Sequence, residues 1–490
     1  MKIYGFFFFL LFILCFLIVF PIRFKKVYQF LTILNSLILL GWVSYFIIFA
    51  NRIELFFIGL FYSVSKINFF FYDYTFFFCF DKLSILLIFL TIFLYFICLC
   101  VIWNIQENFK LLNILLYLVI CFVLLSFMTF DLLIFYIFFE IILIPMVLII
   151  GIWGSRERKL TAAFRFFLYT AIGSIFFLTV IFFLFFFYGT TDLYKLLNCF
   201  IFSKNMQIFF WLFTFFAFAV KFPVFPFHTW LPEAHAEAPT IGSILLAGIL
   251  LKLGPYGLIR FSNVLFPWGL IYFKPLIFLL ALLGLYYTSL TALRQFDIKK
   301  IIAYSSIGHM ALILIGIILN SIEGFCGAFI LLLAHGFVSG GLFFLIGCIY
   351  DRYKTRLILY YNGLIQLNPK MCFFFFLFLL GNIAFPGTLN FISELLILLS
   401  VVEINLYLLI LVGLSSVFVL GYNLYLYSKL FFFFENIHFS VFRNDLVTRE
   451  IIISIIFLFP IFLWGLFPTT LILFFNKNFI ILNFQIYYMI

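Results

Sequence analysis

Apolar residues run along this chain in long stretches, and polar residues gather in the short segments between them. A helix needs about 20 apolar residues to cross a hydrocarbon core of about 30 Å. The runs that meet this length are 5–22, 28–50, 83–103, 111–129, 132–152, 162–188, 207–231, 241–263, 270–293, 301–322, 324–349, 372–400, 404–431 and 451–475. The pattern therefore predicts an all-α membrane protein of about 14 transmembrane helices.

Two regions near the amino terminus need separate treatment. The first run resembles a signal peptide, but it lacks a small-residue cleavage site and runs into Pro21 and the basic Arg23, so we predict an uncleaved helix. The stretch 51–82 is apolar but interrupted by Asn51, Lys66 and Asp73. We expect a re-entrant segment or a loop there.

Two predicted spans are interrupted. In 207–231, Lys221 is followed two and five residues later by Pro223 and Pro226, and 372–400 contains Gly-Asn-Ile-Ala-Phe-Pro-Gly-Thr at 381–388. Backbone hydrogen bonds lost in this way are tolerated in a bilayer only where protein or water replaces them. The broken spans are the seventh and the twelfth. The two broken spans are five helices apart, and helices separated by an odd number cross the membrane in opposite directions. The predicted helices 4–8 and 9–13 therefore form two five-helix repeats of opposite orientation.

Composition and charge agree with a membrane protein. Only 10% of the residues are charged and 67% are hydrophobic, whereas soluble domains are about 25% charged. The net charge of +11 is spread over short loops with no dense basic face, which argues against nucleic-acid binding. Lys and Arg favour the odd-numbered loops, so these are predicted to lie on the inner side, with both termini on the outer side.

Six ionisable residues at depth in the apolar runs are candidates for proton translocation: Glu140, Lys221, Lys252, His309, His335 and Glu394. A charge at the bilayer centre costs at least ~2.5–3.5 kcal/mol. An ion pair between Glu140 and Lys221 would offset this cost; the alternative is a protonated carboxyl group. The two histidines can relay protons, or they can be ordinary core residues. Lys252 either joins that relay or bonds to carbonyl groups freed by Gly254-Pro255.

A polar turn follows the first broken span. It contains His228, Glu233, His235 and Glu237, for which we favour loop capping and proton uptake over a metal site.

The chain has no dinucleotide or phosphate fingerprint, and its cysteines lack iron–sulfur or disulfide spacing. We therefore expect no cofactor in this chain. The implied chemistry is proton movement, in which displacement of Glu140 makes Lys221 release or regain a proton and Lys252, the histidines and water carry it towards Glu394.

Five motifs bear a family resemblance. They are His-Thr-Trp-Leu-Pro-Glu-Ala-His-Ala-Glu-Ala-Pro-Thr at 228–240, Leu-Leu-Lys-Leu-Gly at 250–254, Ala-Leu-Arg-Gln-Phe-Asp-Ile-Lys-Lys-Ile-Ile-Ala-Tyr-Ser-Ser at 292–306, Ala-His-Gly at 334–336, and Pro-Gly-Thr-Leu-Asn-Phe-Ile-Ser-Glu at 386–394. Together they resemble the subunit 4 family of respiratory complex I, NADH:ubiquinone oxidoreductase, over about residues 107–430. Subunits 2 and 5 and the multisubunit cation/proton antiporters are similar. The turn at 228–240 and a glutamate at position 394 favour subunit 4.

The resemblance implies an antiporter-like fold: N-terminal helices in 1–105, a first repeat in 106–263, a second in 270–431 and a C-terminal helix in 451–475. It also implies proton pumping coupled to quinone reduction in other subunits. Glu140 and Lys221 match the ion pair of the family, Lys252 its central lysine, His309 and His335 its axis histidines, and Glu394 its terminal acid.

The same resemblance implies partners and a location. FMN and iron–sulfur clusters are expected in partner subunits, and the partners would be other membrane subunits of the complex, including antiporter-like neighbours, together with lipids but no nucleic acid. The location would be the mitochondrial inner membrane or, alternatively, a bacterial plasma membrane. Two other functions stay open: a subunit of a multisubunit Na+/H+ antiporter, and a scaffold whose charges have lost their role.

Overall fold

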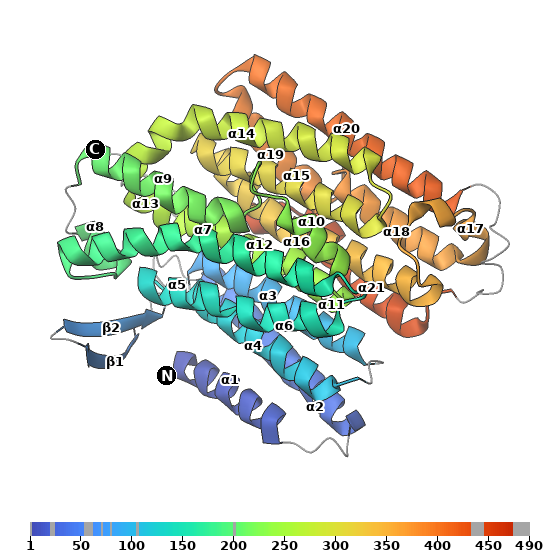
Figure 1. Ribbon diagram of the computed structural model, residues 1–490, viewed down its shortest axis with the longest axis horizontal. Helices are drawn as coiled ribbons and strands as arrows, with labels where there is room; N and C mark the ends of the chain where they lie inside the picture. Colours follow the sequence, from blue (N-terminus) through green and yellow to red (C-terminus); the bar gives the residue numbers. More distant parts are fainter. Residues whose placement is uncertain are drawn as a thin grey trace.

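The computed structural model describes residues 2–19, 25–52, 62–69, 72–78, 81–103, 107–198, 202–432 and 445–473. This part of the chain is nearly all helical, which confirms the predicted fold class. Figure 1 shows helices lying side by side, from α1 and α2 at one edge to α20 at the other. Residues 20–24, the end of the 451–475 run, and Cys79 and Cys199 lie outside the described residues.

Eleven described helical segments are long and apolar enough to cross a membrane. They are α2 (Lys25–Arg52), α3 (Lys82–Ile102), α4 (Phe109–Met128), α5 (Leu132–Ile141) with α6 (Leu143–Trp153), α7 (Lys159–Tyr188), α11 (Thr240–Leu245) through α13 (Asn263–Leu265), α14 (Pro267–Arg294), α15 (Ile298–Leu319), α16 (Ile322–Tyr353), α20 (Leu406–Phe431) and α21 (Thr448–Leu466). Between α11 and α13 lie η2 (Leu246–Leu250), α12 (Leu251–Gly257) and η3 (Leu258–Ser262).

Shorter helices occupy the remaining predicted spans and their connections. α1 is Lys2–Val19, and the two interrupted spans are α9 (Lys204–Lys221) with α10 (Trp230–Glu237) and α18 (Pro369–Asn382) with α19 (Leu389–Val402). The connecting elements are α8 (Leu193–Asn198), η4 (Ile358–Tyr360), α17 (Leu364–Leu367) and α22 (Thr469–Ile472). Both proline-containing interruptions thus fall between helices. The count of fourteen spans, the inverted repeats and the domain limits stay predictions.

The stretch 51–82, for which we expected a loop or a re-entrant segment, contains a β-hairpin. Strands β1 (Tyr62–Phe69) and β2 (Tyr72–Phe78) pair antiparallel, and Phe69 lies opposite Tyr72. The sequence of β1 alternates between apolar and polar residues over part of its length, a pattern typical of a strand rather than a helix. The hairpin lies to one side of the helices (Figure 1).

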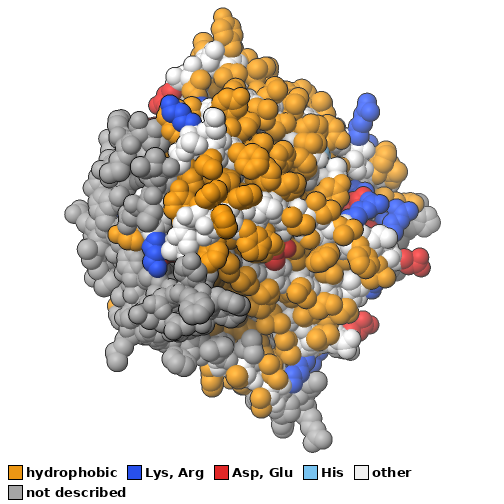
Figure 2. All heavy atoms as spheres, turned by 60° about the vertical axis from the view of Figure 1, so that its left-hand side comes forward, with side chains coloured by type: hydrophobic (Ala, Val, Ile, Leu, Met, Phe, Trp, Pro, Cys, Tyr) orange, Lys and Arg blue, Asp and Glu red, His pale blue; other side chains and the backbone are white. Residues whose placement is uncertain are grey.

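The most buried segments lie in the middle of the molecule. The most apolar windows of α16 and of the α11–α13 segment are completely buried, whereas those of α2 and α20 are mostly exposed. Figure 2 shows a face on which hydrophobic side chains cover most of the described surface, with charged side chains mainly towards the edges. Such a surface suits a hydrocarbon environment. The segments that carry Lys252 and His335 are therefore shielded from lipid.

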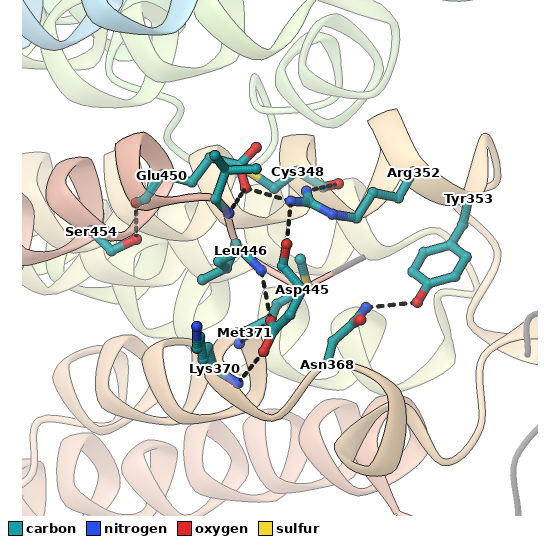
Figure 3. A network of polar contacts seen from close by, with 11 residues as sticks. Cys348, Arg352, Tyr353, Asn368, Lys370, Met371, Asp445, Leu446, Glu450 and Ser454 are labelled. Atoms are coloured by element: carbon teal, nitrogen blue, oxygen red, sulfur yellow. Dashed lines mark hydrogen bonds and ion pairs between the residues drawn. The ribbon is translucent and has the colours of Figure 1, made fainter. Parts of the chain in front are cut away.

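A polar network joins the ends of α16, α18 and α21 (Figure 3). Arg352 pairs with Glu450, and its guanidinium also donates to the carbonyl oxygen of Asp445 at 3.2 Å. The Asp445 carboxylate accepts from the backbone N–H groups of Lys370 at 2.8 Å and Met371 at 3.1 Å. Asp445 thus satisfies free donors in the first turn of α18 and fixes that end of the helix.

Candidate functional site

Glu140 and Lys221 lie together, as the sequence predicted. Glu140 is one residue from the end of α5, Lys221 is the last residue of α9, and 3.8 Å separates Lys221 Nζ from Glu140 Oε1. The ammonium group also donates to the carbonyl oxygen of Phe139 and lies 3.0 Å from the centroid of the Phe139 ring. The ammonium therefore has a carboxylate, a carbonyl oxygen and an aromatic face around it, which together replace water.

The break after Lys221 is compensated by protein groups. Phe222 N–H still bonds to Phe218, but the chain then turns away, and the Trp230 indole donates at 2.9 Å to the carbonyl oxygen of Val220. A freed backbone acceptor in the bilayer needs such a partner. The proline-containing interruption thus ends α9 at Lys221 without leaving the Val220 carbonyl unsatisfied.

Lys252 is completely buried in a helix of irregular pitch. It lies in α12 between the π-helical turns η2 and η3, which are features frequent at functional sites. Its ammonium donates to the Ala247 carbonyl oxygen at 2.5 Å and lies 2.9 Å from His335 Nδ1. Lys252 thus bonds to a backbone carbonyl group and contacts a histidine, and its part in a proton relay stays a prediction.

The row continues from Lys252 through both histidines. The rings of His335 and His309 have centroids 5.7 Å apart, and His309 Nδ1 lies 3.4 Å from Glu394 Oε1. On its other side, His309 Nε2 is 3.0 Å from Asn382 Oδ1. Four of the six predicted residues thus form one continuous row across α12, α16, α15 and α19.

The Glu140–Lys221 pair and this row meet at a tight helix contact. A Cβ atom at Gly254, in α12, would lie only 2.6 Å from the Cβ atom of Phe222, the residue after Lys221. Among the described residues, Glu140 Oε1, His335 Nε2 and His309 Nδ1 are buried with no hydrogen-bond partner. Buried polar atoms of this kind are usually satisfied by internal water.

The polar turn at 228–240 does not gather its side chains around one point. His235 stacks on Phe343 with ring centroids 4.6 Å apart, and His228 packs against Phe225 at 5.6 Å. Glu233 pairs with the exposed Arg165. Across the described ranges, no three His, Cys, Asp or Glu side chains are grouped as metal ligands.

Sequence reasoning missed a buried ionic cluster next to this turn. The side chain of Arg356 is completely buried and lies 3.5 Å from Glu237 and 3.8 Å from Asp297. Lys299, also buried, donates at 2.7 Å to the Ala238 carbonyl oxygen. Neither Arg356 nor Asp297 is among the residues that the sequence predicts to be buried. Their position outside the apolar runs gave no sign that they would be buried.

Two asparagines were missed as well. Asn382 is the last residue of α18, and Asn423 lies inside the apolar run of α20. Their side chains bond to each other at 2.9 Å, and Asn382 also bonds to His309. An amide in an apolar run predicts a functional residue less strongly than a charged side chain does. The sequence did show that Asn382 lies at the interruption of its predicted span.

Comparison with known proteins identifies the family. A family model described as NADH:quinone oxidoreductase/Mrp antiporter, TM matches residues 129–419. The NADH-ubiquinone oxidoreductase chain 4 of Chondrus crispus is 48% identical over 398 residues, covering 80% of this chain and 79% of that protein. The protein of the same name from Arabidopsis thaliana is 46% identical over 389 residues, covering 79% and 78%.

Solved structures agree. A chain of respiratory complex I from Thermus thermophilus with bound NADH matches with a TM-score of 0.83 and 25% identity, over 98% of this chain and 97% of that one. A chain of the archaeal membrane-bound sulfane sulfur reductase has a TM-score of 0.83 at 20% identity, over 96% and 95%, and shows the shared fold alone. The chain belongs to the NADH:quinone oxidoreductase/Mrp antiporter transmembrane family and, within it, to the NADH-ubiquinone oxidoreductase chain 4 proteins.

Proposed function

We propose that this chain is a proton-translocating membrane subunit of an NADH:ubiquinone oxidoreductase, which assembles with the other membrane subunits of that complex. The observation that carries the proposal is the continuous row Lys252–His335–His309–Glu394, together with the adjacent Glu140–Lys221 pair. Lipid-embedded proteins retain such costly groups chiefly on proton and ion pathways. Relatives from red algae, plants and other eukaryotes indicate the mitochondrial inner membrane as the location.

The Glu140–Lys221 pair acts as the switch. At 3.8 Å and an effective dielectric constant of about 20, two opposite charges attract by about 4 kcal/mol. Movement of Glu140 away from Lys221 therefore favours release of a proton, and its return favours uptake.

The row of residues carries the proton sideways. Lys252 contacts His335, and His309 contacts Glu394, so these two transfers span short distances, while the rings of the two histidines between them have centroids 5.7 Å apart. NADH oxidation and quinone reduction occur in partner subunits, which supply the FMN and the iron–sulfur clusters. In this proposal the chain supplies the proton path, and the redox groups belong to its partners.

Variants in the intact complex test this function. Lys221→Ala and Glu394→Gln are expected to lower the number of protons moved per NADH oxidised, measured in sealed membrane vesicles. Lys370→Ala removes an exposed lysine outside the row and is the control, with an unchanged ratio. Pumping at the normal ratio in both Lys221→Ala and Glu394→Gln would overturn the proposal.

The second candidate is a subunit of a multisubunit Na+/H+ antiporter, which the shared family model favours. Purification of the chain from its own membranes separates the two. Flavin and iron–sulfur subunits in the purified assembly support the oxidoreductase, whereas antiporter subunits alone would establish the second candidate.

A further inference from the structure

A chain of side-chain amides ends on one nitrogen of His309. Asn423 Nδ2 lies 2.9 Å from the carbonyl oxygen of Val419, one turn earlier in α20. Asn423 Oδ1 lies 2.9 Å from Asn382 Nδ2, and Asn382 Oδ1 lies 3.0 Å from His309 Nε2. All three side chains are almost completely buried, so water does not compete for these bonds.

The chemistry of these groups fixes the direction of every bond. The Val419 carbonyl can only accept, so the Asn423 atom that touches it is the NH₂ group. The oxygen of Asn423 therefore faces Asn382, which must present its own NH₂ group there. Asn382 is left with its oxygen towards His309, and an amide oxygen only accepts. His309 must carry a hydrogen on Nε2.

The other nitrogen of His309 is left for proton exchange. Nδ1 has no hydrogen-bond partner among the described residues, and Glu394 Oε1 lies 3.4 Å from it. An amide oxygen is far too weak a base to take the Nε2 proton. We propose that Asn382 and Asn423 are positioning residues that hold His309 in the Nε2–H tautomer, so that His309 exchanges protons through Nδ1 only. This inference rests on the proposed function and assigns a role to residues outside the six ionisable groups.

Each step is a simple proton transfer. The O–H bond of protonated Glu394 breaks as the Nδ1–H bond of His309 forms, and the Nε2–H bond persists. The products are a carboxylate and an imidazolium, which attract each other, and the reverse step restores two neutral groups. His309 therefore takes up and releases its proton through Nδ1 alone, so a proton that reaches it from the His335 side also enters at Nδ1 before it passes to Glu394.

His335 differs in its surroundings. Its Nδ1 faces the Lys252 ammonium at 2.9 Å, while its Nε2 has no partner in the described part of the chain. No amide holds either nitrogen, so His335 can accept at Nδ1 and donate at Nε2.

The Tyr422 hydroxyl lies beside Ser305 and both asparagines. A hydroxyl can donate or accept, so the Tyr422 hydroxyl is compatible with the donors and acceptors assigned above.

Substitutions at Asn423 separate tautomer control from packing. Asn423→Leu removes the group that orients Asn382. Asn423→Asp, when protonated, keeps a hydroxyl donor towards Val419 and a carbonyl acceptor towards Asn382. Asn113→Leu, at an equally buried asparagine in α4, controls for loss of a buried amide. We expect Asn423→Leu to slow proton transfer at His309 by about 10²- to 10⁴-fold, the range that positioned proton transfer contributes, and Asn423→Asp to restore it.

The readouts are protons moved per NADH oxidised and infrared difference spectra of the complex with ring-labelled histidine. The His309 signal, identified by its loss in His309→Gln, is expected to show the neutral Nε2–H tautomer in the unmodified complex. An Nδ1–H tautomer there would overturn the inference, and so would normal pumping in Asn423→Leu while Glu394→Gln fails to pump. Normal pumping in both Glu394→Gln and Lys221→Ala would instead overturn the proposed function.

Discussion

Lys221 and Arg165 both pair with glutamates, but their surroundings differ. The Lys221 side chain is 7% exposed and its partner Glu140 22%, whereas Arg165 and Glu233 are 58% and 38% exposed. Loss of one member of a buried pair leaves the other charge without compensation, at a cost of about 3–5 kcal/mol. An exposed pair contributes about 0–1 kcal/mol. Burial, not the presence of a pair, decides which of these contacts matters for stability.

We therefore expect Glu140→Gln to lower the free energy of unfolding by several times more than Glu233→Gln. The thermal midpoint of the purified complex, followed through this chain by a site-specific label, measures the difference. Both substitutions remove one carboxylate and keep a side chain of the same size. Equal shifts in the two variants would show that Glu140 does not compensate the Lys221 charge.

Prediction from sequence was strongest for ionisable residues in apolar runs. Lys252 and His335 stand out in the printed chain because their neighbours are apolar, and the structure places them 2.9 Å apart. Asn382 and Asn423 do not stand out, because an uncharged amide costs less in such a run. Arg356 was assigned to a loop because of its neighbours in sequence, although it packs between Glu237 and Asp297. Burial of a loop residue depends on which helices meet there, which a single sequence does not encode locally.

At the scale of elements, the interruption between α9 and α10 is stabilised by one side chain. The Trp230 indole is the donor to the Val220 carbonyl oxygen. We expect Trp230→Phe to destabilise the protein by about 1–3 kcal/mol, the cost of leaving a buried acceptor unsatisfied. Thermal unfolding of the assembled complex measures this. Trp464→Phe, in α21, makes the same change where the indole packs against Phe337, and a loss as large as that of Trp230→Phe would refute the hydrogen-bond argument.

The contact of α12 with the end of α9 requires a residue without a side chain. A Cβ atom at Gly254 would meet Phe222 Cβ at 2.6 Å and Phe222 N at 2.9 Å, and the backbone atom cannot move aside alone. We expect Gly254→Ala to cost about 1–3 kcal/mol and to lower pumping, because α12 carries Lys252. Gly413→Ala, in α20, meets nothing within 4 Å, and it is expected to be neutral or to stabilise the helix by up to about 1 kcal/mol. Similar losses of stability in both variants would contradict this view of the contact.

Elements were predictable where a local cause exists. Prolines marked the two interrupted spans, and long apolar runs marked the helices. The π-helical turns η2 and η3 were signalled only in part by Gly254-Pro255, because a widened turn also depends on neighbouring helices. The hairpin in 62–78 was missed because the strand-like alternation covers only part of β1 and β2 is mostly aromatic, like the apolar runs of the predicted helices.

At the scale of the whole molecule, the distribution of Lys and Arg predicts which loops face inward. The loop before α7 and the first residue of that helix carry Arg156, Arg158 and Lys159, whereas the segment after α7 and the first residue of α9 carry Lys195 and Lys204. Helix α7 has 30 residues, which corresponds to a length of about 45 Å, more than the hydrocarbon core of about 30 Å. We therefore expect the two loops to lie on opposite sides of the membrane.

Cysteine substitutions at exposed positions in these loops test the predicted orientation. We expect Glu157→Cys to react with a membrane-impermeant maleimide only in vesicles that present the inner face, and Tyr194→Cys only in vesicles that present the outer face. The unmodified chain gives the background of its own cysteines, most of which are buried where the structure describes them. Reaction of both from one side would show that α7 does not cross the membrane. Reversed labelling would keep the fold but turn the proton path around, so that Glu394 would release protons towards the opposite compartment.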